Sequence, residues 1–220
     1  MKAMILAAGR GERMRPLTDT APKPLLKVRG RALIEYHLEA LHAAGVRELV
    51  VNLSWLGERI RAALGDGSQW GVAIHYCDEG PQPLETAGGI FNALSFLGPG
   101  PFAVVNGDVW TDFPMSRLSL GAGKLAHLVL VPNPSHHGQG DFGLETGRVT
   151  RAGGKTYTFS GIAIYRPEFF AGCTAGRFPL LPLLQRAIDS SSLTGEVYQG
   201  VWSDVGTPER LAQLQSGKIG

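Results

Sequence analysis

A glycine- and arginine-rich loop near the start of the chain has the composition of a polyphosphate-binding site. The apolar stretch 4–8 is followed by Gly9, Gly11 and three arginines, and Lys23 then stands between two prolines. Glycines let a backbone approach an anion closely, backbone N–H groups donate hydrogen bonds to it, and cationic side chains neutralise its charge. We therefore predict that a nucleoside triphosphate binds at this loop.

Two common phosphate-binding motifs do not match the loop. A Walker A loop has Gly-Lys-Ser/Thr at the place where this chain has Arg13 and Met14. A dinucleotide fingerprint requires a third glycine where this chain has Met14. The alternative to a phosphate site is a solvated turn after a first strand, and both interpretations stay open at this point.

Two aspartates, far apart in the sequence, each follow an apolar segment. Carboxylates such as those of Asp108 and Asp204 suit Mg²⁺, which takes a few protein oxygens, keeps water ligands and bridges substrate phosphates. Each aspartate could instead cap a turn. If the fold brings them together, they are predicted to share one Mg²⁺. His136 and His137 do not suggest a further metal site, because neighbours on an extended loop point opposite ways and no third ligand has a regular spacing.

The elements that must hold these residues alternate between strands and helices. This order predicts a Rossmann-like, doubly wound, mostly parallel α/β sheet with helices on both faces. Ligands bind beyond the carboxyl ends of such strands, so we expect the Gly9 loop and Asp108 on one rim. Strands are predicted over 2–7, 48–53, 72–76, 102–106, 127–131, 157–165 and 197–202, and helices over 32–44, 56–64, 86–96, 178–189 and 208–215.

The length, composition and net charge of the chain restrict the classes of protein to which it can belong. With 220 residues, 44% of them hydrophobic, the chain can bury a sizeable core, and 1–220 is predicted to form a single domain. A formal net charge of +2 argues against a nucleic-acid partner. Cys77 and Cys173 have no metal-binding spacing and predict free thiols in a reducing compartment. No stretch has membrane-spanning length, so we expect a cytoplasmic protein without a membrane partner.

With these residues assembled, the chain resembles the sugar-1-phosphate nucleotidylyltransferase family. Segments 9–13 and 22–24 resemble the glycine loop and Pro-Lys-Pro of its signature, and 86–89 resembles the segment around the base. Segments 106–108 and 202–208 resemble those that carry its two metal-binding aspartates. The resemblance implies a glycosyltransferase-A-like nucleotidyltransferase fold and an enzyme that joins a nucleoside triphosphate to a sugar 1-phosphate. At position 85, where many relatives have glycine, this chain has glutamate.

The resemblance also implies a role for each candidate residue. Arg13 would hold the departing phosphates, and Lys23 would bridge the α-phosphate and the sugar phosphate. Asp108 and Asp204 would hold Mg²⁺, which is the implied cofactor. Nucleotide contacts are implied for Gly9, Gly11, Glu12, Arg13, Lys23, Thr86 and Gly88, and sugar contacts for Asn106, Asp141, Ser160 and Gly161.

Within the family, the chain is most similar to the branch that transfers UMP from UTP to N-acetyl-α-muramate 1-phosphate in peptidoglycan recycling. Segments 34–38, 105–111, 126–142 and 159–161 carry this similarity, and the short length fits it. We expect a monomer that binds UTP and a sugar 1-phosphate. Two alternatives remain. One is the same chemistry on another pair of substrates, such as GTP with mannose 1-phosphate or UTP or dTTP with glucose 1-phosphate. The other is a non-catalytic module that binds nucleotide sugars.

Overall fold

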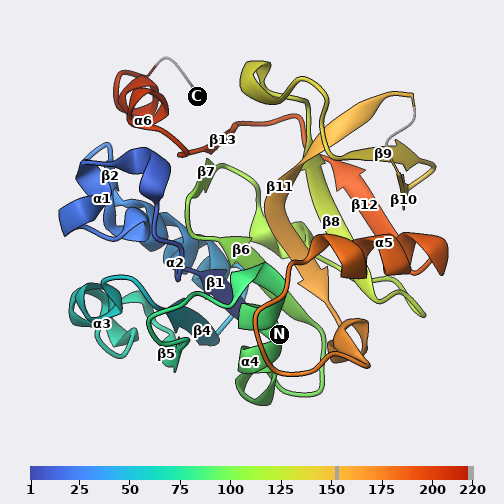
Figure 1. Ribbon diagram of the computed structural model, residues 1–220, viewed down its shortest axis with the longest axis horizontal. Coiled ribbons are helices and arrows are strands. Elements are labelled where there is room, and N and C mark those ends of the chain that lie inside the picture. Colours follow the sequence, from blue (N-terminus) through green and yellow to red (C-terminus); the bar gives the residue numbers. More distant parts are fainter. Residues whose placement is uncertain (152–153, 218–220) are drawn as a thin grey trace.

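The computed structural model describes residues 1–151 and 154–217, and its centre is a nine-stranded sheet (Figure 1). The strand order is β5-β4-β1-β6-β11-β8-β12-β10-β9, so neighbours in the sheet are often distant in sequence. The strands are β1 (Lys2–Leu6), β4 (Glu48–Leu53), β5 (Ala73–Asp78), β6 (Phe102–Asn106), β8 (Ala126–Val131), β9 (Phe142–Glu145), β10 (Arg148–Thr150), β11 (Thr156–Tyr165) and β12 (Leu193–Val197).

The first half of the sheet is parallel, as the alternation of strands and helices predicts. β5, β4, β1 and β6 pair side by side in the same direction. The centre of β1 is fully buried, because Ala3, Met4 and Ile5 are covered on both faces of the sheet. The carboxyl ends of these strands therefore meet at one rim, where the loop after β1 and the turn after β6 lie next to each other.

The second half of the sheet is mixed, which corrects the expectation of a mostly parallel arrangement for that half. β11 runs antiparallel to both β6 and β8, whereas β12 runs parallel to β8. A parallel connection needs a crossover of a dozen or more residues. The strands β9, β10 and β11 instead follow one another through short connections. Thr146 and Gly147 both have positive φ angles, which form the tight hairpin between β9 and β10.

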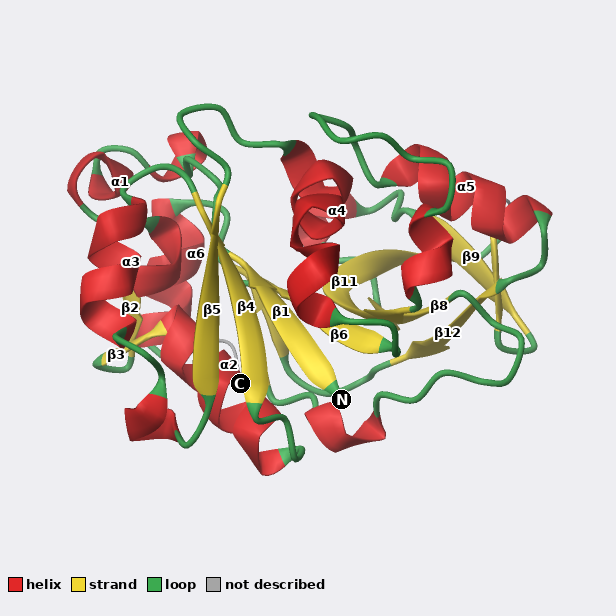
Figure 2. Ribbon diagram, turned by 90° about the horizontal axis from the view of Figure 1, so that it is seen from below, coloured by secondary structure: helices red, strands yellow, loops and turns green. Residues whose placement is uncertain are grey.

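Helices cover both faces of the sheet (Figure 2). α2 (Leu33–Ala43) and α3 (Gly57–Leu64) bury residues such as Leu38 and Ile60 against one face. α4 (Glu85–Leu97) and α5 (Leu181–Asp189) bury residues such as Ile90 and Leu184 against the other. The predicted doubly wound organisation is thus present, and α5 begins later than the predicted helix 178–189.

Two short ribbons complete the framework beside the main sheet. β7 (Val109–Thr111) pairs antiparallel with β13 (Trp202–Asp204), and β2 (Lys27–Val28) pairs with β3 (Arg31–Ala32). The predicted strand 197–202 is wrong, because β12 ends at its first residue and β13 begins at its last. The remaining elements are α1 (Leu17–Thr20), α6 (Pro208–Gln215) and the 3-10 turns at Glu12–Met14, Lys23–Leu25, Ser68–Trp70, Met115–Arg117, Ser135–His137 and Pro167–Phe170.

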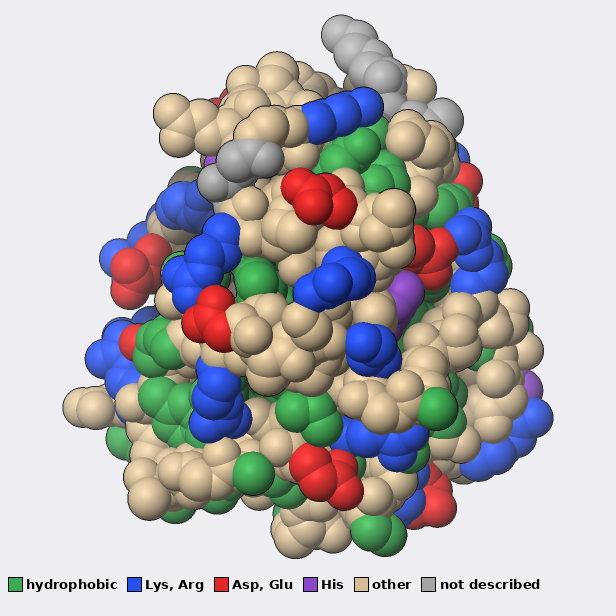
Figure 3. Space-filling model, turned by 90° about the vertical axis from the view of Figure 1, so that its right-hand side faces the viewer, with side chains coloured by type: hydrophobic (Ala, Val, Ile, Leu, Met, Phe, Trp, Pro, Cys, Tyr) green, Lys and Arg blue, Asp and Glu red, His purple; other side chains and the backbone are tan. Residues whose placement is uncertain are grey.

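The surface carries charges of both signs. On the face seen in Figure 3, Lys and Arg side chains are interspersed with Asp and Glu, with no extended field of one sign over the part drawn in colour. None of the described helices is long and apolar enough to cross a membrane.

A buried histidine on α2 gives the fold a pH dependence. His37 is 2% exposed and its Nε2 atom has no hydrogen-bond partner among the described residues. Burial lowers the pKa of His37 to about 4, against the smaller opposing effects of a hydrogen bond to the Val109 backbone and of the Asp108 carboxylate. The imidazole is therefore neutral in the folded protein at neutral pH.

We expect the free energy of unfolding to fall as the pH is lowered from about 6.5 to about 4. In this window the unfolded chain binds a proton at His37 that the folded chain excludes, which costs on the order of 3 kcal/mol at the acid end. His37→Gln removes this proton uptake, so urea titrations at several pH values should show a shallower decline. His75→Gln, at an exposed histidine, is the control. An unchanged pH slope in His37→Gln would contradict the assignment.

Candidate active site

The loop after β1 is a tight turn held by its own hydrogen bonds. Gly11 has a φ of 65°, and a Cβ atom there would lie 2.9 Å from the Thr18 side chain. The Gly11 carbonyl accepts hydrogen bonds from the Met14 N–H and the Thr18 hydroxyl, each at 2.8 Å. Glycine is therefore required at this position both for its conformation and for its lack of a side chain.

A cavity of about 690 Å³ opens beside this loop, and a second of about 220 Å³ adjoins it. The two share Gly9, Lys23, Pro83, Glu85 and Asp108 in their walls, so they form one continuous depression at the rim of the parallel strands. The larger cavity is also lined by Arg10, Gly11, Glu12, Arg13, Met14, Gln82, Arg177 and Gly206, and the smaller by Leu6, Ala7, Ala8, Pro24, Asn52, Glu79, Thr86 and Asn106.

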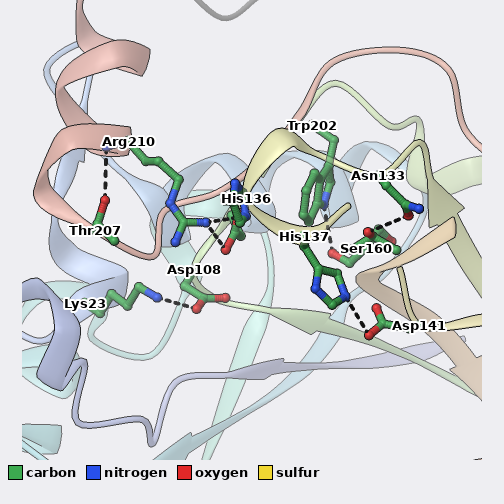
Figure 4. A network of polar contacts seen from close by, with 12 residues as sticks. Lys23, Asp108, Asn133, His136, His137, Asp141, Ser160, Trp202, Thr207 and Arg210 are labelled. Carbon is green, nitrogen blue, oxygen red and sulfur yellow. Dashed lines mark hydrogen bonds and ion pairs between the residues drawn. The ribbon is translucent and has the colours of Figure 1, made fainter. Parts of the chain in front are cut away.

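Lys23 and Asp108 form an ion pair at the floor of this depression. The Lys23 Nζ atom lies 2.5 Å from Asp108 Oδ2, and Lys23 is only 8% exposed (Figure 4). A buried ammonium is costly unless it is paired. The flanking prolines restrict the backbone at Lys23, so the side chain has a fixed direction toward Asp108.

Asp204 is also paired with a cation, but only one of its two carboxylate oxygens accepts a hydrogen bond from the described residues. Arg210 Nη1 donates to Asp204 Oδ2, and His136 Nε2 lies 3.2 Å from Oδ1. The His136 contact lacks hydrogen-bond geometry, so Oδ1 is buried without a donor among the described residues. A buried carboxylate oxygen without a donor is costly, and a cation would satisfy it.

The β7–β13 pairing brings Asp204 of β13 beside the turn that carries Asp108, just before β7. Asp204 stands opposite Val109, and the Val205 N–H donates to the Asp108 carbonyl at 2.8 Å. Carboxylate oxygens are the ligands that Mg²⁺ prefers, and the unpartnered oxygen of Asp204 fits a cation. Within the described part of the chain, no three His, Cys, Asp or Glu side chains form a closed cage. Such a site suits an ion that completes its shell with phosphates and water.

A chain of hydrogen bonds that the sequence analysis missed holds the end of β1. Asn52 Oδ1 accepts from the Ala7 N–H at 2.8 Å, and Asn52 Nδ2 donates to Glu79 Oε1 at 2.6 Å. The other oxygen of Glu79 accepts from the Leu84 N–H at 2.7 Å, just before α4. The only signal for Asn52 is its amide within the apolar run of β4. Gly89 is required here, because its Cβ would lie 2.4 Å from Glu79 Oε1.

The two predicted base-binding residues at the start of α4, Thr86 and Gly88, have different surroundings. Thr86 lines the smaller cavity, whereas Gly88 does not line either one. A Cβ at Gly88 would lie 2.4 Å from the Gly176 carbonyl, so this glycine allows the 174–178 loop to pack against the helix. Glu85 has a φ of 61°, the left-handed conformation that favours the glycine found in many relatives, and its carboxylate pairs with Arg177 at 2.9 Å.

Asn106 and Gly161 meet at the predicted sugar side, but the Ser160 hydroxyl is directed elsewhere. Gly161 has a φ of 79°, and a Cβ there would lie 2.6 Å from Asn106 Nδ2, so glycine leaves room for the amide. Ser160 is 1% exposed and donates to the Val129 carbonyl at 2.6 Å. A hydroxyl contact from Ser160 to a sugar is therefore corrected to a structural role in the irregular part of β11, where its carbonyl also accepts from Trp202.

Asp141 lies near the 3-10 turn at Ser135–His137 and is held by two groups. His137 Nε2 lies 3.0 Å from Asp141 Oδ1, and the Phe159 N–H donates to Oδ2 at 2.8 Å. His136 contacts Asp204. Its neighbour His137 contacts a different aspartate, Asp141 (Figure 4). Asp141 does not line the two cavities beside the glycine loop.

A sequence profile described as Nucleotidyl transferase matches residues 2–151, including the glycine loop, Lys23 and Asp108. The chain belongs to this family. It is 52% identical to the N-acetylmuramate alpha-1-phosphate uridylyltransferase of Neisseria meningitidis serogroup B, over 98% of this chain and 97% of that one. It is 35% identical to the Caulobacter vibrioides enzyme of the same name, over 94% and 92%.

Other members of the nucleotidyl transferase family are more distant. Mannose-1-phosphate guanyltransferase beta-A of Xenopus laevis is 31% identical over 95% of this chain, which covers 62% of that protein. Among solved structures, a putative glucose-1-phosphate thymidylyltransferase from Bacillus anthracis superposes with a TM-score of 0.84 at 19% identity, over 98% of this chain and 94% of that one. This likeness confirms the predicted nucleotidyltransferase fold.

The importance of Asp108 and Asp204 for turnover can be tested by removing the charge of each carboxylate. Asp108→Asn and Asp204→Asn each remove a negative charge needed for a hard cation, so turnover should fall at least about a hundredfold. Both residues lie at the rim and not in the core, so circular dichroism spectra should be unchanged. Asp189→Asn, at an exposed ion pair with Arg151, should keep full activity. Near-normal turnover in Asp108→Asn or Asp204→Asn would show that the substituted aspartate does not bind a metal ion that the reaction needs.

Proposed function

We propose that this protein transfers UMP from UTP to N-acetyl-α-muramate 1-phosphate, giving UDP-N-acetylmuramate and pyrophosphate in peptidoglycan recycling. The observation that carries the proposal is the 52% identity, over almost the full length of both chains, to a relative named for this activity. The depression at the glycine loop supports it, because the cations in its wall, Arg10, Arg13, Lys23 and Arg177, suit polyanionic substrates.

The reaction we propose needs positioning and charge more than acid–base chemistry. An oxygen of the sugar phosphate attacks the α-phosphorus of UTP, the new P–O bond forms, and the bond to the β-phosphate breaks as pyrophosphate leaves. The nucleophile is already an anion, so no side chain has to remove a proton. The barrier comes from bringing anions together and from charge that develops on the α-phosphate and leaving group.

Each group around the depression has a part in this proposal. The backbone of the loop at Gly9, Gly11 and Glu12 would bind the triphosphate. Arg13 would neutralise the departing phosphates, and Lys23 would contact the α-phosphate and the sugar phosphate. Residues Thr86 and Gly88 would contact or support the uracil. The sugar would be bound by Asn106, which lines the smaller cavity, and by Gly161 and Asp141, which lie outside the lining of both cavities.

Asp108 and Asp204 are the residues that would hold Mg²⁺. Bound there, the ion would supply positive charge beside the phosphates. In the described structure each carboxylate is paired with a side-chain cation, Lys23 or Arg210. We propose that these cations move from the carboxylates to substrate anions when the metal is bound. Cytoplasmic location and a monomeric state are also part of the proposal, and the unpaired Cys77 and Cys173 agree with a reducing compartment.

Lys23 provides a direct test of the charge assigned to the transition state. Lys23→Met keeps an unbranched side chain close to the stem of lysine in length but removes the ammonium, and we expect kcat to fall about 10²- to 10³-fold. Single-turnover measurements of pyrophosphate release would show whether the chemical step is affected. Lys27→Met, at an exposed lysine close in sequence, should behave as the unmodified protein. A change confined to the KM for UTP would limit Lys23 to nucleotide binding.

A panel of substrates tests the proposed specificity. Pyrophosphate release would be measured with UTP, dTTP and GTP against the 1-phosphates of N-acetylmuramate, N-acetylglucosamine, glucose and mannose. We expect the highest kcat/KM for UTP with N-acetylmuramate 1-phosphate. A preference for GTP with mannose 1-phosphate would support the alternative substrates, and the absence of turnover with every pair would support a binding module.

A further inference from the structure

A third cavity lies beyond Asp204 and is not used by the proposed chemistry. Its volume is about 390 Å³, and it is placed between β13, the start of α6 and the Ser135–His137 turn. Among the described residues that line it, Arg210 is the single Lys or Arg and Asp204 the single acid. The lining residues are Pro134, Ser135, His136, Trp202, Ser203, Asp204, Thr207, Arg210 and Gln213.

Arg210 is held firmly at the boundary between this cavity and the large one. Its side chain is 14% exposed. The backbone N–H of Arg210 donates to the hydroxyl of Thr207, the residue that caps the start of α6. Gly206 lines the large cavity, and a Cβ there would lie 2.5 Å from Arg210 Nη2. The guanidinium therefore rests against a backbone without a side chain, facing the region between the nucleotide loop and the third cavity.

The hydrogen-bonding capacity of Arg210 is only partly used. A guanidinium has five N–H donors. Among the described residues, contacts are made by Nη1 alone, to Asp204 Oδ2 and to His136 Nε2 at 2.7 Å. Asp204 supplies the negative charge that balances Arg210 in this state. If the Asp204 carboxylate binds a metal ion, the largely buried guanidinium of Arg210 loses its counterion. A buried charge without a counterion costs free energy unless another anion takes the place of the carboxylate.

The geometry points to Arg210 as the residue that binds the carboxylate of the lactyl group of N-acetylmuramate. This inference rests on the proposed function, because it assigns the part of the sugar that distinguishes muramate from glucosamine. N-acetylmuramate 1-phosphate carries two anions, its phosphate and its carboxylate. The planar fork of a guanidinium suits a carboxylate, and the third cavity provides room beside it for the substituent.

Three other basic side chains of the described residues, those of His137, Lys155 and Arg29, do not line the third cavity. His137 contacts Asp141, Lys155 lies 5.3 Å from the centre of the Tyr157 ring, and Arg29 lies 5.1 Å from that of Trp110. Arg210 is largely buried, it has N–H donors without a partner among the described residues, and its counterion Asp204 is the residue proposed to bind the metal ion. It is therefore a specificity-determining residue, and it has no part in bond formation.

The test compares two sugars that differ only in the lactyl group. kcat/KM would be measured for N-acetylmuramate and N-acetylglucosamine 1-phosphates in the unmodified protein, Arg210→Gln and Arg210→Lys. Any effect through Asp204 is common to both sugars, whereas loss of the carboxylate contact affects muramate alone. We expect the preference for muramate to fall about 10- to 100-fold in Arg210→Gln, and by less in Arg210→Lys. Arg151→Gln, which breaks an exposed pair with Asp189, should leave the preference unchanged.

A binding measurement makes the test independent of turnover. Calorimetric titration with UDP-N-acetylmuramate and UDP-N-acetylglucosamine should show that Arg210→Gln weakens binding of the first by about 10- to 100-fold more than the second. If Arg210→Gln keeps the preference of the unmodified protein in both measurements, the inference is wrong. If the unmodified protein has no preference for muramate, the proposed sugar specificity fails, and Arg210 then has no carboxylate to bind.

Discussion

The antiparallel pairing of β13 with β7 is the constraint on which the candidate site depends. It returns the end of the chain to the rim of the parallel strands and brings Asp204 beside the segment that carries Asp108. α6 secures this return, because Leu211 and Leu214 pack in a common cluster with Met14 of the glycine loop. One small apolar cluster therefore links the triphosphate loop to the second aspartate, so loss of packing there would disturb both.

Charge balance within the site follows from this arrangement. Asp108 and Asp204 would repel each other if both were unpaired, and each is neutralised by its own cation, Lys23 or Arg210. The same two cations are well placed for anionic substrates. Under the proposed function, the cations that neutralise the two aspartates in this structure would contact substrate anions once a metal ion is bound.

The sequence predicts the parallel half of the fold and the glycine loop well, since apolar runs, helical periodicity and glycines are local signals. The mixed half follows from pairing between distant strands, which such signals do not encode, and the predicted strand 197–202 was wrong for this reason. The sequence also led us to expect that Asp108 and Asp204 share a metal ion, which stays a prediction, and the register of β7 and β13 places Asp204 opposite Val109, the residue after Asp108. Ser160 was misassigned because its position in a strand does not reveal that a local irregularity turns its hydroxyl toward Val129.

We propose that Asp108 and Asp204 exchange their side-chain cations, Lys23 and Arg210, for one shared metal ion. Anomalous diffraction from a crystal grown with Mn²⁺ and UDP-N-acetylmuramate would test it most directly. We expect a single strong anomalous peak, with oxygens of both aspartates at about 2.1–2.3 Å from the metal ion. We also expect Lys23 near a phosphate and Arg210 away from Asp204. A peak bound to one aspartate only, with Arg210 still paired to Asp204, would contradict it.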